Sequence, residues 1–495
     1  MKHSLIISFF YLCGHFSFGQ YALDPNFGFD ENPYAFDANG TIDYWYDSTT
    51  GPDDKIYFTG WTNEPSNSLV IGSMDANGEF NLNYAPFYNR FYAPSETQSI
   101  NGYEIEMQSS DLPVVGGIRI VQGASVSSLF MARFTAGGNL DASFGDLGYF
   151  FYAPEDQDCY LGEIIVSPTD EIYMLGRVRE PGFGNMSHLI IKLTADGQLD
   201  ESFSEDGILT FNTADSNNYL SGGLLLDNGQ LLVAGKDNGP VNIYRINADG
   251  TLDGGFNGSG EIATPGLSEI LAIKQYGDWF YALSTGSGAS SFIYKFDENG
   301  LDGSYGIQGE VDLGYDGFTD DAWFSEDGKV YFTGTFQGSS YVVRADTSGV
   351  LDDAFFEGGL SSFEISENTI ALFSTTPLND GSLITSGHAI DLFSSGSGQD
   401  FVAYKLTENG VVDNVQEQGA SAAMVYPNPF TSEITVESEQ QISSIRIFDL
   451  SGKLVHEDMP STQKFTIKHL RLNTGIYSVH IQTANGIQQV QVVKM

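Results

Sequence analysis

The sequence predicts an all-β protein whose main part is a closed array of small repeated sheets. Two observations lead to this prediction. One short phrase recurs along the chain, and the intervals contain short apolar strands separated by turns of Gly, Asn and Asp. The 57 Gly and 36 Phe agree with it, because Gly marks turns and aromatic residues favour strands. With about 50 to 60 residues and four strands in each repeat, the expected fold is a seven-bladed β-propeller followed by a small β-sandwich.

The recurring phrase is clearest at 192–207, which reads KLTADGQLDESFSEDG. It contains a strand end, a tight turn at Asp196-Gly197, a Leu-Asp pair, and a Phe between small and acidic residues. The turn Gly supplies a positive φ, and the Leu and Phe are expected to wedge between neighbouring blades. An incomplete copy, Leu23–Gly28, comes before the first turn. The predicted repeats are about 23–78, 79–138, 139–197, 198–250, 251–300, 301–349 and 350–410, within a propeller domain at 20–415.

A second landmark lies near the middle of each repeat, where an alternating strand usually ends in Gly. These strands are 55–60, 112–117, 171–176, 230–235, 279–284, 329–334 and 382–387. A single four-stranded sheet cannot bury both of its faces, whereas sheets stacked around an axis do so and protect their edges. An open β-solenoid is the alternative, although a four-strand period is too long for one simple coil.

The first residues have the pattern of a secretory signal peptide, predicted at 1–19. An apolar run from Leu5 to Cys13 is followed by small residues at Ser17 and Gly19. Cleavage after Gly19 would leave Gln20 as the new N-terminus; a buried N-terminal strand is the alternative. The run is too short to span a bilayer, and no other apolar run reaches about 18 residues, so no membrane span is expected.

The charge of the chain is strongly negative and unevenly distributed. The sequence has 65 Asp and Glu against 21 Lys and Arg, a formal net charge of -44. Residues 421–495 carry equal numbers of acidic and basic residues, so the acidity belongs to the middle of the chain. Such a polyanion repels phosphate backbones and anionic lipid heads, and no nucleic acid partner is expected. With only Cys13 and Cys159, no disulfide framework or cysteine metal site is expected either.

No residue of the array is assigned a catalytic, cofactor-binding or metal-binding role. His188 and His388 are far apart and offer little for a zinc site or a general base. The pairs Asp320-Asp321 and Asp352-Asp353 could suggest glycoside hydrolysis, but chance pairs are expected in so acidic a sequence. No GxSxG, HExxH or P-loop motif occurs.

Two weaker site hypotheses remain. Acidic turns such as 75–78, 196–197, 249–250 and 297–300 could hold calcium, but none matches the EF-hand pattern, so hairpin turns are the first expectation. Aromatic residues could instead line a groove for glycans, although packing between blades is expected for most of them. These aromatic candidates are Trp45, Trp61, Trp279 and Trp323, with Tyr44, Tyr46 and Tyr92.

The tail at 421–495 breaks the repeat pattern and predicts a sandwich of at most seven strands, with turns at Ser451-Gly452 and Asn485-Gly486. Four of its motifs, in order and at the end of the chain, resemble the type A C-terminal sorting domain of the type IX secretion system. They are YPNPF at 426–430, IFD with GK at 447–453, LNTGIY at 472–477 and VVK at 492–494. The sorting residues that this resemblance implies are Tyr426, Pro427, Asn428, Pro429, Gly475, Tyr477 and Lys494.

The resemblance implies export through the type IX machinery, which would recognise 421–495. The expected location is outside the cell or on the outer surface of a Gram-negative bacterium of the Bacteroidetes type. An ordinary accessory sandwich domain is the alternative. The repeats at 23–410 resemble the delta-60 repeat family, whose members carry RLNADGSLDTSFG-like phrases, and this resemblance implies a β-propeller-like array.

Together these features predict a non-enzymatic, secreted or cell-surface binding or scaffold protein for glycan or protein. The alternative is a secreted carbohydrate-active enzyme with a site on the propeller axis, and a third hypothesis is a purely structural surface-layer component. Carboxylates and aromatic rings clustered at one mouth of the ring would favour the enzyme. A scattered acidic surface would favour binding.

Overall fold

The structure is a computed structural model of the whole chain, and its contacts divide the chain into two compact units, Met1–Gly410 and Val411–Met495. It describes residues 21–23, 34–36, 43–62, 68–78, 81, 84, 90–91, 98–124, 126–180, 184–211, 218–237, 241–264, 269–285, 290–316, 318–325, 328–336, 339–352, 355, 360–363, 370–390, 399–408, 424–426, 430–449, 454–468, 472–473, 475–483 and 486–494. In these ranges, no helix is long and apolar enough to cross a membrane.

The described residues of the first unit form seven antiparallel sheets, which we number in chain order. Sheet 1 contains β3 (Asp43–Thr50), β4 (Ile56–Thr62), β5 (Ser68–Met74) and β6 (Arg90–Phe91). Sheet 2 contains β7 (Gln98–Gln108), β8 (Leu112–Val121), β9 (Ser127–Arg133) and β10 (Tyr149–Tyr152). Sheet 3 contains β11 (Asp158–Val166), β12 (Ile172–Arg179), β13 (Met186–Leu193) and β14 (Ile208–Phe211). Sheet 4 contains β15 (Asn218–Leu225), β16 (Leu231–Asp237), β17 (Val241–Ile246) and β18 (Glu261–Ala263).

Sheet 5 contains β19 (Glu269–Tyr276), β20 (Trp279–Thr285), β21 (Ser290–Asp297), β22 (Gly300–Leu301) and β23 (Glu310–Asp316). Sheet 6 contains β24 (Phe318–Phe324), β25 (Lys329–Phe336), β26 (Ser339–Asp346) and β27 (Leu360–Phe363). Sheet 7 contains β28 (Ile370–Pro377), β29 (Leu383–Ile390) and β30 (Gln399–Glu408), with β1 (Tyr21–Leu23) and β2 (Tyr34–Phe36) paired to β30. The 3₁₀ turns are η1 (Pro52–Asp54) and η2 (Phe256–Gly258).

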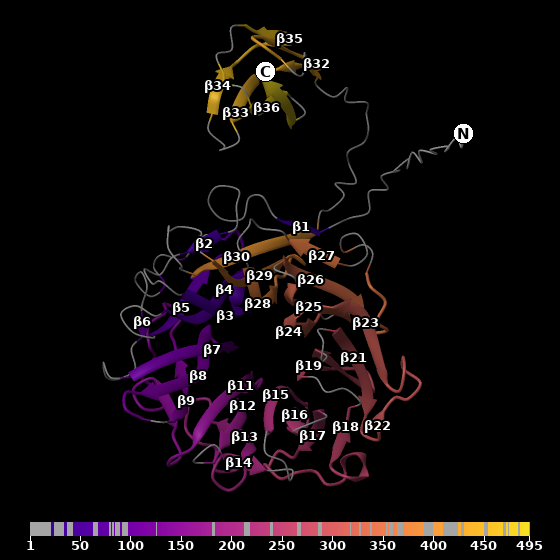
Figure 1. Ribbon diagram of the computed structural model, residues 1–495. Coiled ribbons are helices and arrows are strands. Elements are labelled where there is room, and N and C mark those ends of the chain that lie inside the picture. Colours follow the sequence, from indigo (N-terminus) through magenta and orange to yellow (C-terminus); the bar gives the residue numbers. More distant parts are fainter. Residues whose placement is uncertain are drawn as a thin grey trace, which may run out of the picture. The chain divides into compact units, whose positions relative to one another are not determined.

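The sheets stand around a central axis (Figure 1), and the first strand of each sheet is the innermost. Strand β3 contacts β7, β7 contacts β11, and this continues through β15, β19 and β24 to β28, which contacts β3 again. The ring is therefore closed, and the predicted all-β propeller is confirmed. An open solenoid has no such contact between its first and last sheets.

The chain closes the ring by returning its N-terminal end to the last sheet. Tyr21–Leu23 pair with Leu406–Glu408 of β30, and Tyr34–Phe36 pair with Phe401–Ala403. The recurring phrase lies between the third and fourth strands of a sheet, so each sequence repeat begins with the outer strand of one sheet. This offset explains why an incomplete copy precedes the first turn: the N-terminal strands β1 and β2 supply the outer edge of sheet 7.

Each copy of the phrase folds into a turn followed by a wedge. In sheet 3, the amide of Gly197 donates to the Thr194 carbonyl at 2.9 Å, and the Lys192 ammonium pairs with Asp200 at 2.7 Å. Phe203 is buried among residues of sheets 3 and 4, including Tyr244, as predicted. The same basic–acidic pairing recurs in four other copies, at 2.7 to 3.0 Å: Arg133–Asp141, Arg245–Asp253, Lys295–Asp302 and Arg344–Asp352.

The turn glycine also contacts the buried Phe of the preceding copy of the phrase. Gly197 has a φ of +77°, and a Cβ built on it would lie 2.6 Å from the ring of Phe144, which belongs to the copy before it. The amide of Gly145 donates to the Asp196 carbonyl at 2.7 Å, which fixes this contact. A residue other than Gly would strain the backbone and displace the aromatic ring.

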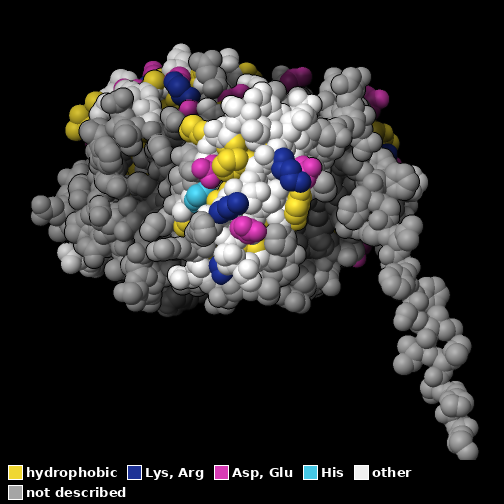
Figure 2. All heavy atoms as spheres, turned by 90° about the horizontal axis from the view of Figure 1, so that it is seen from above, with side chains coloured by type: hydrophobic (Ala, Val, Ile, Leu, Met, Phe, Trp, Pro, Cys, Tyr) yellow, Lys and Arg dark blue, Asp and Glu magenta, His cyan; other side chains and the backbone are white. Residues whose placement is uncertain are grey.

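The second unit contains two antiparallel sheets over one apolar core. The first consists of β31 (Met424–Tyr426), β32 (Ile434–Ile442) and β35 (Thr462–Ile467). The second consists of β34 (Leu454–Asp458), β33 (Ser444–Asp449), β36 (Gly475–Thr483) and β37 (Gly486–Lys494). Both sheets contribute buried residues to this core, for example Ile434 and Val436 of the first sheet and Ile447 and Val479 of the second. On the face shown in Figure 2, basic side chains lie among acidic and hydrophobic ones and do not form a separate patch.

Candidate functional site

The candidate site is a hollow of about 550 Å³ on the propeller axis, which we call the axial pocket. All seven innermost strands contribute to its wall. The lining residues are Tyr46, Asp47, Tyr103, Glu104, Glu106, Gly162, Glu163, Ile164, Ser221, Glu269, Leu271, Ala272, Asp321, Ala322, Trp323 and Phe373. Six of them are acidic, and none is Lys or Arg.

A bulge at the same place in every innermost strand positions these side chains. The register of each strand shifts by one residue, for example between Trp45 and Asp47 and between Gly102 and Glu104. The other five shifts are 161/163, 220/222, 270/272, 319/321 and 372/374. Because an extra residue twists the strand locally and re-aims its side chains, the bulge places residues on either side of it in the wall of the axial pocket.

The recurring glycine predicted to end the second strand lies inside that strand, and it accommodates this bulge. In six sheets a Gly of the second strand pairs with the residue just before the shift, as Gly60 does with Trp45; in sheet 5 the position is Ser284. A Cβ on Gly60 would lie 1.7 Å from the carbonyl oxygen of Tyr44, and one on Gly176 would lie 2.1 Å from that of Tyr160. The recurring glycine is therefore needed where the bulged backbone approaches closely.

Three of the axial carboxylates join neighbouring innermost strands. Asp47 accepts a hydrogen bond from the amide of Ile105 in sheet 2 at 2.8 Å, and Asp321 accepts one from the amide of Thr375 in sheet 7 at 2.8 Å. Glu163 accepts one in the same way from the amide of Gly223 in sheet 4. All three carboxylates directly follow the bulge, so they form a recurring link between sheets.

Glu104 occupies the same position in sheet 2, but no described residue donates a hydrogen bond to it. Glu106, two residues further along β7, accepts only a long bond of 3.3 Å from the amide of Met107. One oxygen of Glu163, Oε2, is also buried without a hydrogen-bond partner in the described part of the chain. These three side chains therefore keep acceptor capacity for a ligand.

Four carboxyl groups of the axial pocket have raised pKa values. Burial raises the pKa of Asp47 to about 6. Burial and the charge of Asp47 raise the pKa of Glu106 to about 7. Burial and the neighbouring carboxylates raise the pKa values of Glu104 and Glu163 well above their usual range. Near neutral pH the pocket can therefore both donate and accept hydrogen bonds.

Aromatic rings form another part of the wall. The ring of Tyr46 stacks on Phe373 at 5.5 Å between centroids and meets Tyr103 edge-on at 5.0 Å. Trp323 also lines the pocket, and its indole stacks on Tyr331 at 4.1 Å. The axial pocket thus presents apolar ring surface beside its acidic groups.

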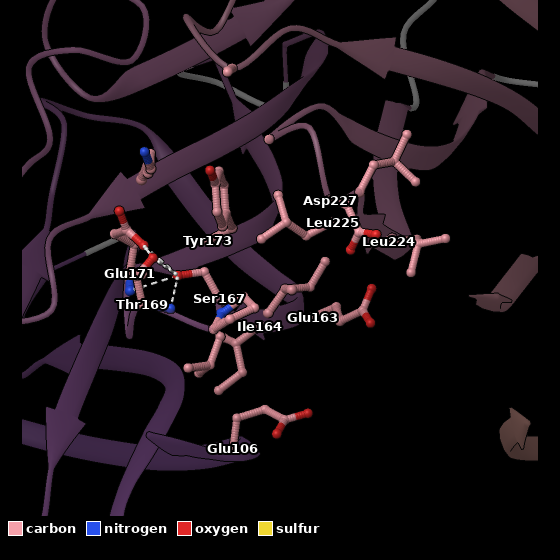
Figure 3. A pocket seen from close by; sticks show the side chains of 18 of the residues that line it. Glu106, Glu163, Ile164, Ser167, Thr169, Glu171, Tyr173, Leu224, Leu225 and Asp227 are labelled. Atoms are coloured by element: carbon pink, nitrogen blue, oxygen red, sulfur yellow. Dashed lines mark hydrogen bonds between the residues drawn. The ribbon is translucent and has the colours of Figure 1, made fainter. Parts of the chain in front are cut away.

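A second hollow of about 830 Å³ adjoins the axial pocket at Glu106, Glu163 and Ile164, which line both. Figure 3 shows it between the ends of β11 and β15, with the Glu106 and Glu163 carboxylates pointing the same way. At its edge, Ser167 and Thr169 donate to the Glu171 carboxylate. Lys192 at this edge is paired with Asp200, so these polar groups at the edge of the second hollow are satisfied within the protein.

Of the aromatic candidates, Tyr46 and Trp323 line the axial pocket. Trp45 is fully buried and stacks on Phe58 at 3.7 Å, so it belongs to the core. Trp61 stacks on Tyr44, and Trp279 lies beneath the ammonium of Lys295. Tyr92 lies outside the described residues.

The histidines and the cysteine lie in strands. His188 is buried in β13 beside Phe211. His388 in β29 packs against Tyr44, and burial lowers its pKa to about 4. Cys159 is fully buried, and burial raises the pKa of its thiol to about 12.

The acidic pairs and turns singled out in the sequence lie in different surroundings. Asp321 lines the axial pocket, whereas Asp352 pairs with Arg344 at 3.0 Å; the side chains of Asp320 and Asp353 lie outside the described residues. Asp249 accepts from the amide of Thr251 in its own turn at 3.0 Å, as expected of a hairpin turn. In the described ranges, no three Asp, Glu, His or Cys side chains are placed to hold a metal ion, and calcium binding stays a prediction.

Several of the sorting residues meet at one edge of the second unit. Gly475 of β36 pairs with Lys494 of β37, and Lys494 forms a bridge with Phe430. Tyr477 is buried and donates to the Asn473 carbonyl at 2.9 Å. Tyr426 lies on the other sheet, where its hydroxyl donates to Glu437. Pro427, Asn428, Pro429, and the predicted cleavage residues Gly19 and Gln20, lie outside the described residues.

Comparison with known families and structures gives the following matches. Residues 424–495 match the secretion system C-terminal sorting domain. Residues 114–144, 226–256 and 326–355 match the domain of unknown function DUF5122, a β-propeller family. No curated protein sequence matches the chain.

Among solved structures, the chain is similar to a streptogramin B lyase, with 14% identity and a TM-score of 0.43 over 76% of this chain and 97% of that one. It is similar to PorZ, a surface component of the type IX secretion system of Porphyromonas gingivalis, with 9% identity and a TM-score of 0.25 over 91% and 81%. It is also similar to a puromycin hydrolase, with 11% identity and a TM-score of 0.43 over 85% and 61%. These values are too low to transfer a site or an activity.

The repeat matches and the ring of sheets agree with each other, and the tail match agrees with the motifs at 426–430, 472–477 and 492–494. The chain is therefore a β-propeller protein with DUF5122 repeats and a C-terminal type IX sorting domain, and it is secreted or placed on the cell surface.

Proposed function

We propose that this exported protein is a non-enzymatic binding protein that holds a glycan in its axial pocket. The observation that supports this is the convergence of aromatic rings and hydrogen-bonding carboxyl groups from six of the seven innermost strands on one hollow of about 550 Å³. Ligand pockets of roughly 300 to 1,000 Å³ with a few polar groups are typical of small-molecule sites. A sugar matches this wall, because its C–H face stacks on aromatic rings while its hydroxyls bind carboxyl groups.

The first experiment is a glycan array probed with the mature full-length protein. A hit should then be measured by calorimetry with Tyr46→Ala and Phe373→Ala, which remove ring surface from the pocket. Trp279→Ala is the matched control, because this indole packs against Lys295 and does not line the pocket. We expect the two pocket variants to lose affinity and the control to keep it. Binding that is unchanged in both pocket variants would contradict the proposal.

A glycan-cleaving enzyme is the second candidate. Carboxyl groups and aromatic rings clustered on the propeller axis are the arrangement expected of such an enzyme. Binding is proposed first because Asp47, Glu163 and Asp321, three of the six carboxylates, accept backbone amides that join neighbouring sheets. One further observation favours the enzyme. Asp47 and Glu106 share the pocket, and their pKa values of about 6 and about 7 would let one carboxyl group act as an acid while the other is ionised. Incubation of a bound glycan with the protein separates the two functions. The binding proposal predicts that the glycan is recovered intact, whereas shorter products that disappear with Glu106→Gln would establish the enzyme.

A further inference from the structure

We infer that the axial pocket recognises a protonated amine, carried by an amino sugar of the bound glycan. This inference rests on the proposed glycan-binding function and specifies the chemical class of its ligand. Three features of the pocket carry it: its uncompensated acidity, its unused acceptors, and its aromatic wall.

The acidity of the pocket is uncompensated along most of its wall. Asp47, Glu104, Glu106, Glu163 and Asp321 line it without any basic lining residue. Burial raises the pKa of the sixth carboxylate, Glu269, and the nearby charges of Lys236 and Arg177 partly offset this rise. A cation is the ligand that relieves the mutual repulsion of such a group of carboxylates.

The unused acceptors are the second and independent feature. Asp47 and Asp321 already accept backbone amides of the neighbouring sheets. In contrast, Glu163 Oε2 is buried without a hydrogen-bond partner among the described residues. Burial and neighbouring carboxylates act on Glu104, and no hydrogen bond from a described residue does. An ammonium group has three N–H donors and no acceptor, so it satisfies these oxygens directly. A neutral hydroxyl supplies only one donor.

The aromatic wall is suited to the same group. The ring of Tyr46 lies between the other two, with its centroid 5.5 Å from that of Phe373 and 5.0 Å from that of Tyr103, and all three residues line the pocket. The face of an aromatic ring attracts an ammonium ion, more strongly where water is excluded. Carboxylates and rings together therefore prefer an amino sugar to the same sugar in its neutral N-acetylated form.

The test compares three oligosaccharides of equal length on the mature full-length protein by calorimetry at pH 6: glucosamine, N-acetylglucosamine and glucose tetramers. We expect the glucosamine tetramer to bind at least about tenfold more tightly than the N-acetylated one, as one charge-assisted contact would give. Buffers of different ionisation enthalpy should also show proton release on binding, because the cation favours the ionised carboxylates.

Substitutions test whether the carboxyl groups of the axial pocket cause the preference for the amine. Glu104→Gln and Glu106→Gln should each reduce the preference for the amine, and thermal unfolding would show that they are folded. Glu201→Gln removes a charge from an exposed position and should leave the preference unchanged. Equal affinity for the charged and N-acetylated tetramers, or a preference that survives both pocket variants, would overturn the inference.

Failure of the inference differs from failure of the proposed function. Neutral tetramers that bind as well as the charged one, through the axial pocket, would leave glycan binding intact and remove only the amine. No binding of any tetramer or array glycan would remove the proposed function itself. Calcium ions that occupy the carboxylates and displace the glucosamine tetramer would assign the acidic groups to a metal and overturn the inference.

Discussion

Substitution of Glu106 by Gln should stabilise the protein at alkaline pH and leave its stability nearly unchanged at acidic pH. Burial and the charge of Asp47 raise the pKa of Glu106 from an ordinary 4.5 to about 7 in the folded protein. The folded state therefore binds this proton more tightly than the unfolded state does. The stability that this group contributes is present below pH 4.5 and is lost as the pH rises through 7.

The expected size follows from the shift. A change of about 2.5 pKa units corresponds to roughly 3 kcal/mol between the two pH limits, at about 1.4 kcal/mol per unit. A Gln at this position carries no charge, so the free energy of unfolding of Glu106→Gln at pH 8 should exceed that of the unsubstituted protein by up to about 3 kcal/mol. The gain should shrink to near zero at pH 4.5.

The assay is urea unfolding followed by fluorescence at several values between pH 4.5 and 8. Asp302 does not titrate in this range, because the hydrogen bond from Lys295 lowers its pKa to about 2. Glu201→Gln is the control, since it makes the same change of net charge at an exposed site. A Glu106→Gln variant that is destabilised at pH 8, or whose pH profile runs parallel to that of the control, would refute the reasoning.

Three further predictions follow from the fold and the tail. Phe203→Ala should cost about 3 to 5 kcal/mol of unfolding free energy, measured by urea titration, because this ring is fully buried between sheets 3 and 4; a cost below 1 kcal/mol would contradict the wedge. Gly197→Ala should lower the melting temperature, because it combines a φ of +77° with a close contact to Phe144, whereas Gly254→Ala, whose Cβ meets nothing within 4 Å, should change it little. Deletion of 421–495 should leave the protein in the periplasm, as detected by cell fractionation, and normal export of the truncated chain would refute the sorting role.

The repeated sheets could be predicted because each copy of the phrase specifies its own local structure. In KLTADGQLDESF the turn glycine, the Lys192–Asp200 pair and the buried Phe203 act within one sheet or between adjacent ones, so the pattern is visible in a short window. The closure of the ring was not predictable in this way. It depends on pairing between Tyr21–Leu23 and β30, at opposite ends of the array, and nothing in either segment marks the partner.

Most residues of the axial pocket were missed for a similar reason, and only Tyr46, Asp321 and Trp323 of its wall were named from the sequence. Asp47, Glu104, Glu163 and Asp321 stand in separate repeats and meet only because the ring closes, so each one reads locally as a strand residue. A signal for them was nevertheless present. The recurring glycine of the second strand pairs with the residue before each bulge, so aligning the repeats on it would have placed the four carboxylates in one column.

The most direct test of the central claim, that the axis of the propeller is the ligand site, is hydrogen–deuterium exchange of the mature full-length protein with and without its bound glycan. Slower exchange in β3, β7, β11 and β24, with no change in the C-terminal unit, is the predicted result. Protection confined to outer strands of the sheets or to 424–494 would contradict it.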